Sequence, residues 1–530
     1  MSVGDPVGQG VPQESRDDAS GWRRPSLHYA PARNWMNDPN GLVHHDGVYH
    51  LFYQHNPVGE GWGNMSWGHA TSTDLFDWTE QPVAIGQTFD EWGRNVEDVF
   101  SGSVVVDHDN TSGFGSLDAP PLFAVYTSAY TLFHPDRAGL QAQSIAYSND
   151  NGSTWTTYAG NPVVDRGSTE FRDPKVFRYH GDGPGEQWWV MVAVEAVDRQ
   201  VVLYRSENLL DWEHVSTFGP AGAVGGVWEC PDLFELPVDE DPRTTRWVLV
   251  VSVNPGGAAG GGGVQYFVGD FDGTTFVSQP TTGPRWLDWG RDHYAAVSFN
   301  DVADGRRIMI AWMCDWAYAA DLPITPWCSH MSLPREVSLT DLAGRIELRQ
   351  QIVTEIDRHA EPPLAVSSRS TGMPGDGIEP GTHLVGDGYD VFRLHVELGI
   401  GDAERAGVVV RASEGFSAEP ANAAAGTEGT LIGYDVTRGE VFVDRTRSGA
   451  VDFHPDFAGV SAAPVPTDGG VIRLEIYLDR TSVEVIAAGG TRTISSLIFP
   501  DPSSLGLGVF ALGGAARLRR LDVVPLRGGP

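Results

Sequence analysis

Acidic residues stand beside prolines at three separate points of the chain. Asp38 precedes Pro39, Asp173 precedes Pro174, and Glu229 lies two residues before Pro231. Proline restricts the residue before it to extended backbone conformations, so an acid in that position is held stiffly. A rigidly held carboxylate can act as a nucleophile, as a general acid or base, or as a grip for hydroxyl groups. One such acid alone could serve a turn or an ion pair, but three in similar settings predict a shared site.

The residues around these acids differ in a way that suits a division of labour. The segment Asp38-Pro39-Asn40-Gly41 is predicted to form a type I turn. Arg172 is expected to keep Asp173 ionised, and Trp228 is expected to give Glu229 an apolar wall that favours its protonated form. Carboxyl groups that share a pocket while holding different charges suit glycoside cleavage, in which one attacks the anomeric carbon and another protonates the leaving oxygen.

The elements that would position these acids follow a loose repeat of about sixty residues. Its apolar strand runs lie at Tyr49–Tyr53, Leu122–Tyr126, Trp188–Val194, Trp247–Val253 and Ile308–Trp312. Four of the runs are followed by a second strand and by a polar turn that ends in an aromatic residue. This pattern predicts a five-bladed β-propeller, in which matching positions of successive blades converge on the central axis. The alternative is a set of unrelated hairpins in a large sandwich.

The texture of the chain changes near residue 350. Ile346–Ile356 is predicted to form a short helix or connector, and the alternating Val-, Thr- and Gly-rich runs that follow predict a β-sandwich. The expected fold is therefore all-β, a five-bladed β-propeller followed by a C-terminal β-sandwich. The expected divisions are a polar tail (1–24), the propeller (25–350), a linker (351–363) and the sandwich (364–530).

Composition excludes several classes of function. The formal net charge of −34 disfavours nucleic acids and anionic membranes as partners, and no apolar run is long enough to cross a membrane. The cysteines number three, too few for a disulfide framework, and neither CxxC nor HExxH is present, so we expect no metal and no cofactor. The first 20 residues lack the apolar stretch of a signal peptide. The chain is thus expected to be cytoplasmic, or secreted after loss of a leader.

The chain resembles glycoside hydrolase family 32, the fructan hydrolases and invertases. The resemblance rests on the three acidic motifs and on further segments that span nearly all of residues 25–525: Trp62-Gly63, Trp67–Ala70, Phe100–Ser103, Asp288–Ala295, Ile310–Trp312, Leu333–Glu336, Asp444–Gly449 and Ile498–Pro500. It implies a retaining double displacement on a β-fructofuranoside. Asp38 would be the nucleophile, Glu229 the acid and then the base, and Asp173 a stabiliser that holds fructose hydroxyls. The substrate-binding positions implied by the resemblance are Asn37, Gln54, Trp62, Phe100, Ser101, Arg172 and Trp312.

Within this family the chain is more similar to levanases and inulinases than to sucrose-specific invertases. The similarity lies in Asn254–Gly257, Gln265–Gly269 and the segment from Pro326-Trp327 to Glu336. Cys328, Asp315 and His293 depart from the family pattern and are expected near the pocket rim. The expected partner is a fructose-containing oligo- or polysaccharide, and a polymeric substrate would favour an extracellular location.

Three alternatives remain open at this point. The first is a levan fructotransferase, which releases a difructose anhydride by letting a hydroxyl of the substrate attack the fructosyl-enzyme. The second is an inactive fructan-binding protein, against which the intact Asp38, Asp173 and Glu229 argue. The third is an inverting five-bladed arabinan hydrolase, whose carboxyl groups would stand farther apart to admit a water molecule.

Overall fold

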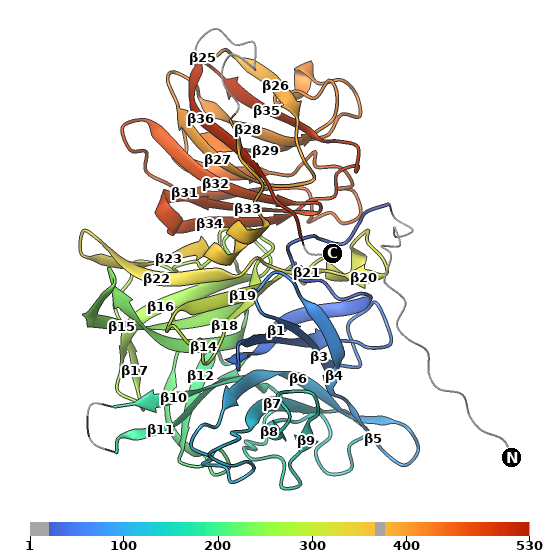
Figure 1. The fold of residues 1–530 in the computed structure, drawn as a ribbon, viewed down its shortest axis with the longest axis vertical. Coiled ribbons are helices and arrows are strands. Elements are labelled where there is room, and N and C mark those ends of the chain that lie inside the picture. The colour runs from blue at the N-terminus through green and yellow to red at the C-terminus, as the bar shows by residue number, and fades with distance from the viewer. Residues whose placement is uncertain (1–20, 182, 184, 366–376, 529–530) are drawn as a thin grey trace, which may run out of the picture.

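The structure is a computed structural model that describes residues 21–181, 183, 185–365 and 377–528. The described chain is almost entirely strand, and it forms a five-bladed propeller and a β-sandwich stacked on it (Figure 1), as the sequence predicts. The helical segments of the described residues are short 3-10 turns: η1 (Ala319–Asp321), η2 (Thr354–His359), η3 (Pro420–Asn422) and η4 (Ala488–Gly490). Most of the expected polar tail lies outside the described residues.

Each of the five blades is built of antiparallel strands, and a parallel pairing of Val238 with Leu339 joins blades 4 and 5. Blade 1 contains β1 (Asn34–His45), β2 (Val48–His55), β3 (Ser66–Ser72) and β4 (Thr79–Ile85). Blade 2 contains β5 (Thr88–Phe89), β6 (Asn95–Val106), β7 (Leu122–Tyr130), β8 (Gln141–Ser148) and β9 (Thr156–Thr157). Blade 3 contains β10 (Phe171–His180), β11 (Gln187–Glu195), β12 (Gln200–Ser206) and β13 (Glu213–Phe218). Blade 4 contains β14 (Val227–Val238), β15 (Asp241–Asn254), β16 (Gly263–Phe271) and β17 (Phe276–Ser278). Blade 5 contains β18 (Tyr294–Ser298), β19 (Arg307–Met313), β21 (His330–Met331), β22 (Arg335–Leu342) and β23 (Arg345–Ile352).

The innermost strands of the blades, β1, β6, β10, β14 and β18, surround the propeller axis, each in contact with the next. The ring closes where β20 (Trp327–Cys328), from the last part of the propeller, pairs in parallel with the start of β1. The strongly apolar runs of the sequence are the second strands of the blades, β2, β7, β11, β15 and β19. They are buried on both sides because hydrophobic clusters fill the space between neighbouring blades.

Two sheets form the C-terminal sandwich, with an aliphatic core between them. One sheet contains β24 (Leu364–Ala365), β25 (Gly377–Ile378), β27 (Val391–Gly399), β32 (Val471–Asp479), β33 (Ser482–Ala487), β34 (Arg492–Leu497) and β36 (Ala516–Pro525). The other contains β26 (Gly381–Asp387), β28 (Arg405–Ala412), β29 (Thr430–Asp435), β30 (Glu440–Asp444), β31 (Val460–Pro464) and β35 (Gly506–Leu512).

The helix or connector predicted from residue 346 is wrong in its first half. Residues 346–352, expected to begin a helix or connector, form the outer strand β23 of blade 5, and the connecting turn η2 begins only at Thr354. Strand pairing buries Glu347, Leu348 and Gln350, and it prevails over the helical propensity of Glu, Leu and Gln.

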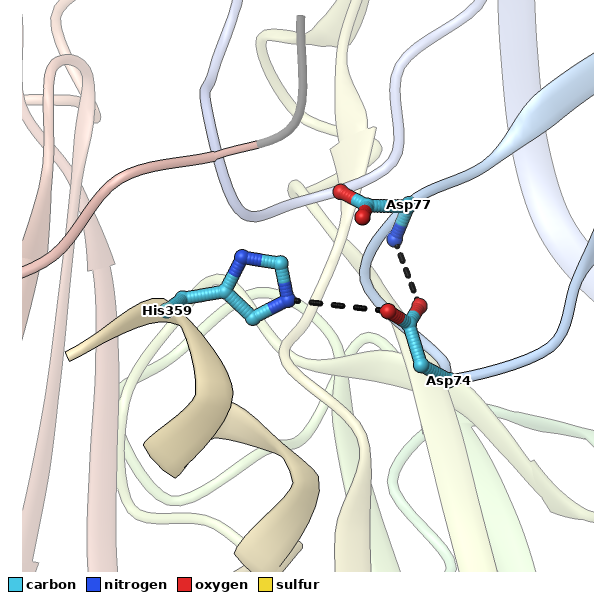
Figure 2. Close-up of side chains that lie close together, drawn as sticks. All are labelled: Asp74, Asp77 and His359. Atoms are coloured by element: carbon cyan, nitrogen blue, oxygen red, sulfur yellow. Dashed lines mark hydrogen bonds and ion pairs between the residues drawn. The ribbon is translucent and has the colours of Figure 1, made fainter.

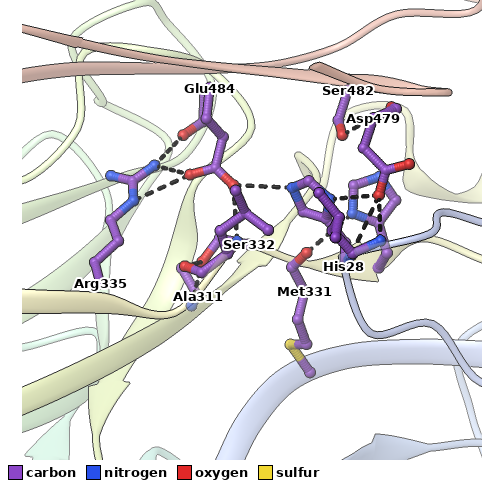
Figure 3. A network of polar contacts seen from close by, with 12 residues as sticks. His28, Ala311, Met331, Ser332, Arg335, Asp479, Ser482 and Glu484 are labelled. Carbon is purple, nitrogen blue, oxygen red and sulfur yellow. Dashed lines mark hydrogen bonds and ion pairs between the residues drawn. The ribbon is translucent and has the colours of Figure 1, made fainter. Parts of the chain in front are cut away.

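Buried charges join the propeller to the sandwich (Figure 3). Arg335 of blade 5 donates to Glu484 of the sandwich, with Nε 3.0 Å from Oε2, and pairs with Asp288 at 2.9 Å. On its other side Glu484 accepts from His28, which precedes β1, and His28 also contacts Asp479 at 2.9 Å. All five side chains are almost fully buried. Each charge is compensated, and removing one partner would leave a buried charge unpaired, which costs several kcal/mol.

This interface predicts a pH-dependent stability. Burial alone would lower the pKa of His28, but hydrogen bonds to Asp479 and Glu484, together with their charges, raise it to about 9. An unfolded histidine titrates near 6.5, so between pH 6.5 and 9 the folded state binds the extra proton and stability falls as pH rises. The loss is on the order of 3 kcal/mol. Thermal unfolding from pH 6 to 9 should show Tm falling more steeply for the wild type than for His28→Gln, which should already be destabilised at pH 6. Parallel curves for the two proteins would refute the assignment, and His383→Gln, a change at a half-buried histidine outside this interface, is the matched control.

Candidate active site

The three acids singled out in the sequence come from three inner strands: Asp38 from β1, Asp173 from β10 and Glu229 from β14. They meet at one end of the propeller axis. The Sγ atom of Cys230 lies 3.7 Å from Oδ2 of both Asp38 and Asp173. The guanidinium of Arg172 lies 3.9 Å from Asp173 and 3.1 Å from Glu229. The acids therefore form one cluster with Arg172 as its cation.

A β-bulge in every inner strand aims these side chains at the axis. The register with the second strand shifts between Met36 and Pro39, Phe100 and Gly102, Arg172 and Lys175, Glu229 and Asp232, and Tyr294 and Val297. A bulge leaves a residue out of the hydrogen-bonded ladder and re-aims a side chain, and it tolerates a proline, which has no N–H to donate. The segment from Asp38 to Gly41 is thus a bulged strand, and the predicted type I turn is wrong.

Asp38 keeps one carboxylate oxygen without a well-aligned hydrogen bond in the described part of the chain. Ser101 Oγ donates to its Oδ2 at 3.2 Å, while Oδ1 is buried and makes no well-aligned hydrogen bond with any described residue. Burial, followed by the negative charge of Glu229, raises the pKa of Asp38 to about 6. Near neutral pH this carboxyl group is therefore mostly ionised and keeps an oxygen uncommitted, which is what a nucleophile needs.

Asp173 is held by its backbone as much as by its side chain. It has a positive φ of 60°, its N–H donates to Thr127 Oγ1 at 3.0 Å, and its Oδ2 accepts from the Cys230 N–H at 3.1 Å. Burial raises its pKa to about 7, because the charges of Glu229 and Asp38 add to burial and together outweigh Arg172. The charge of Arg172 lowers this pKa, as expected, but does not offset burial and the two neighbouring acids, and Arg172 lies nearer to Glu229.

Both oxygens of Glu229 are engaged. Arg172 donates to Oε1 from Nε at 3.2 Å and from the terminal nitrogen at 3.1 Å, and Tyr294 donates its hydroxyl to Oε2 at 2.5 Å. Trp228 makes no wall for this acid: it is fully buried on the other face of β14, against Phe218 and Phe267. Adjacent residues of a strand point to opposite faces, which explains the failed prediction.

The other proposed substrate-binding residues surround the cluster, with one exception. Asn37 is buried and accepts from Trp35 Nε1, and Gln54 donates to Asn40 at 3.2 Å. Trp62 is 54% exposed and stands edge-to-face with Phe100, their ring centroids 6.0 Å apart, so it forms an open aromatic edge.

Trp312 is the exception. It is completely buried, with no surface open to solvent or to the pocket. Its Nε1 donates to Ser329, and its ring packs on Trp35 and Trp316. The expectation that Trp312 contacts substrate is therefore corrected to a supporting position behind the pocket.

The positions that depart from the family pattern lie behind the rim. His293 is buried 4.0 Å from Asp288 in the domain interface, and Cys328 Sγ contacts the Ala319 carbonyl. Asp315 is buried as well and accepts the Gly262 N–H at 2.8 Å. Gly262 belongs to the glycine-rich loop between β15 and β16, and it packs so closely on Tyr294 that a Cβ there would come within 2.8 Å of the ring. Asp315 thus fastens a loop that supports the Tyr294 contact with Glu229.

Sequence reasoning missed Tyr294, Cys230 and Asn40. None carries a motif of its own. Tyr294 and Cys230 lie at the bulges of β18 and β14, just as Asp38 and Asp173 lie at the bulges of β1 and β10. A small pocket lies beside the acids. It is lined by Pro39, Asn40, Ser101, Gly102, Asp173, Pro174, Lys175, Cys230, Pro231 and Val297.

Comparisons with known proteins agree over nearly the whole chain. Residues 28–351 match the glycosyl hydrolases family 32 N-terminal domain, and residues 366–525 match the family's C-terminal domain. A levanase of Bacillus subtilis is 44% identical over 95% of this chain and 70% of its own length. An extracellular exo-inulinase of Aspergillus niger is 42% identical over 94% of both chains.

Solved structures show the same fold. The crystal structure of exo-inulinase from Aspergillus awamori is similar with a TM-score of 0.86 and 38% identity, over 97% of this chain and 99% of that one. The fructofuranosidase of Schwanniomyces occidentalis, solved with fructose, gives a TM-score of 0.82 and 29% identity, over 96% and 99% of the chains. With both of its domains matched, the chain belongs to glycosyl hydrolase family 32.

Proposed function

We propose that this protein is a fructan β-fructosidase that cleaves β-D-fructofuranosidic bonds with retention of configuration. The observation that carries the proposal is the meeting of Asp38, Asp173 and Glu229, from three inner strands, in three different environments. The levanase and exo-inulinase relatives support a fructan as the substrate.

The environments suit a double displacement. Asp38, ionised near neutral pH with Oδ1 uncommitted, attacks the anomeric carbon and forms a fructosyl-enzyme. Glu229, oriented by Arg172 and Tyr294, gives its proton to the leaving oxygen and later takes one from the attacking water. Asp173, fixed by its backbone contacts, binds fructose hydroxyls and stabilises the positive charge of the transition state.

The remaining contacts follow from side-chain chemistry. The amides of Asn37 and Gln54 and the hydroxyl of Ser101 are suited to sugar hydroxyls, as is the guanidinium of Arg172. Trp62 and Phe100 offer an apolar edge that covers a sugar ring and excludes water.

The location of the protein is proposed from its substrate. None of the helices in the described part of the chain has the length and apolar character needed to cross a bilayer. A polymeric fructan lies outside cells, and one of the close relatives is an extracellular exo-inulinase. We therefore propose that this protein acts outside the cell.

The experiment is a product profile from levan, inulin and sucrose run side by side, with Asp38→Asn as the blank. Free fructose from levan or inulin is the expected result. A cyclic difructose would instead establish transfer to the substrate's own hydroxyl. Binding of levan without release of any sugar would overturn catalysis altogether.

A further inference from the structure

The turn between β3 and β4 meets the connector η2 at a cluster of possible metal ligands, well apart from the carboxylates of the pocket in the fold. Asp74 and Asp77 come from the turn, and His359 is the last residue of η2 (Figure 2). One ligand atom from each residue lies within 4.8 Å of the others. In the described part of the chain this is the single group of its kind.

The protonation of His359 follows from its hydrogen bond. Its Nδ1 lies 2.8 Å from the carbonyl oxygen of Arg527. A carbonyl can only accept, so Nδ1 carries the hydrogen, and in the neutral imidazole Nε2 presents a lone pair. Metal-binding histidines are commonly fixed in this way, with one ring nitrogen bonded to a backbone carbonyl and the other on the metal.

The Nε2 atom of His359 points into the cluster without a hydrogen bond. The side chain is only 8% exposed, and Nε2 is buried with no hydrogen-bond partner among the described residues. A buried ring nitrogen that lacks a partner is costly. What Nε2 faces is Asp74 Oδ2, at 3.8 Å, which is too far for a hydrogen bond.

Asp74 is oriented by its other oxygen. Oδ1 accepts the N–H groups of Phe76 at 3.0 Å and Asp77 at 2.8 Å and the Ser72 hydroxyl at 3.0 Å. These bonds leave Oδ2 aimed at the histidine (Figure 2). A lone pair and a carboxylate oxygen that face each other repel, unless a positive charge lies between them.

Two kinds of positive charge could fill this role, a proton on Nε2 or a metal ion. A proton would draw the pair to hydrogen-bond distance, as buried charged pairs do, whereas at 3.8 Å both atoms can still reach one ion between them. A second carboxylate, Asp77, adds negative charge beyond what one proton balances. A nitrogen ligand with two carboxylates favours a transition-metal ion over Ca²⁺ or Mg²⁺, which prefer all-oxygen sites.

We propose that His359 Nε2, Asp74 Oδ2 and an Asp77 carboxylate oxygen bind a divalent transition-metal ion such as Zn²⁺, with water completing its coordination. The ion would tie blade 1 to the connector between the two domains, and through the His359 hydrogen bond to Arg527 near the end of the chain. Its role is thus to hold the domains together, and it takes no part in the reaction.

The test measures Zn²⁺ binding to the full-length protein after dialysis against a chelator. Calorimetry should show one Zn²⁺ per chain, and Zn²⁺ should raise Tm by about 2 °C or more. His359→Asn keeps a donor at the position of Nδ1 but has no atom at Nε2, so Zn²⁺ affinity should fall more than about 100-fold. Asp77→Asn, at an exposed residue, should weaken binding about tenfold or more without unfolding the turn.

The control is His108→Asn, which changes another histidine beside aspartates, 3.4 Å from Asp301 and 61% exposed. It should leave Zn²⁺ affinity unchanged, and sucrose hydrolysis at 25 °C should not change when the metal is removed. The proposal is overturned if the wild type binds no Zn²⁺, if His359→Asn binds it as tightly as the wild type, or if Ca²⁺ binds these residues in preference to Zn²⁺.

Discussion

Replacing Asp38 with asparagine is expected to lower kcat on levan and inulin by roughly 10⁴-fold or more. The amide is nearly the same size, so Ser101 keeps a partner, but it cannot bond to the anomeric carbon. This loss corresponds to about 5 kcal/mol of transition-state stabilisation. Initial rates at saturating substrate, by a reducing-sugar assay, measure it.

The fold should survive this change. Burial disfavours the charge of Asp38, as its raised pKa shows, so a neutral amide should keep or raise Tm. Asp46→Asn, at an exposed residue of the β1–β2 turn, is the matched control and should keep full activity. An Asp38→Asn protein that melts like the wild type and retains more than a tenth of its rate would remove Asp38 from the role of nucleophile.

Replacing Glu229 with glutamine should give a loss that depends on the leaving group. On levan the lost general acid should lower the rate by roughly 10³-fold. On a nitrophenyl fructoside, whose leaving group needs no proton, the first step should be largely spared. The second step still lacks its base, so nitrophenol should appear in a burst of one equivalent per active site, followed by a slow steady state.

Asp38→Asn provides the contrast, because without a nucleophile it should give no burst on either substrate. Azide, a small anion that needs no general base, should speed the slow phase of Glu229→Gln and yield fructosyl azide. Equal losses on both substrates, or a burst in Asp38→Asn but not in Glu229→Gln, would reverse the assigned roles.

The sequence predicts the scaffold well because the blades rest on local patterns. The second strands are continuous apolar runs, and burial between blades requires just that composition. The sites of the acids are also visible, since each stands beside a proline, but the extended backbone expected before a proline is wrong for Asp173, which has a φ of 60°. What these motifs do not reveal is the bulge: Asp38-Pro39-Asn40-Gly41 has the composition of a turn, and only pairing of β1 with β2 makes it a strand.

The errors concern contacts that only the tertiary structure decides. Arg172 adjoins Asp173 in sequence, yet its guanidinium reaches Glu229 of the next blade. Trp312 lies behind the pocket because Trp35 and Trp316 cover it, and His293 reaches the sandwich interface. The Tyr294 contact joins β18 to Glu229 of the preceding blade, 65 residues away in the chain, so no local pattern could predict it.

The most direct test is to trap the covalent intermediate. Glu229→Gln is mixed with a nitrophenyl fructoside, quenched in acid within the burst, digested and examined by peptide mass spectrometry. We predict a fructosyl group attached to the peptide that contains Asp38, with fragmentation placing it on that side chain. A fructosyl group on Asp173, or a full burst with every peptide unmodified, would contradict the mechanism.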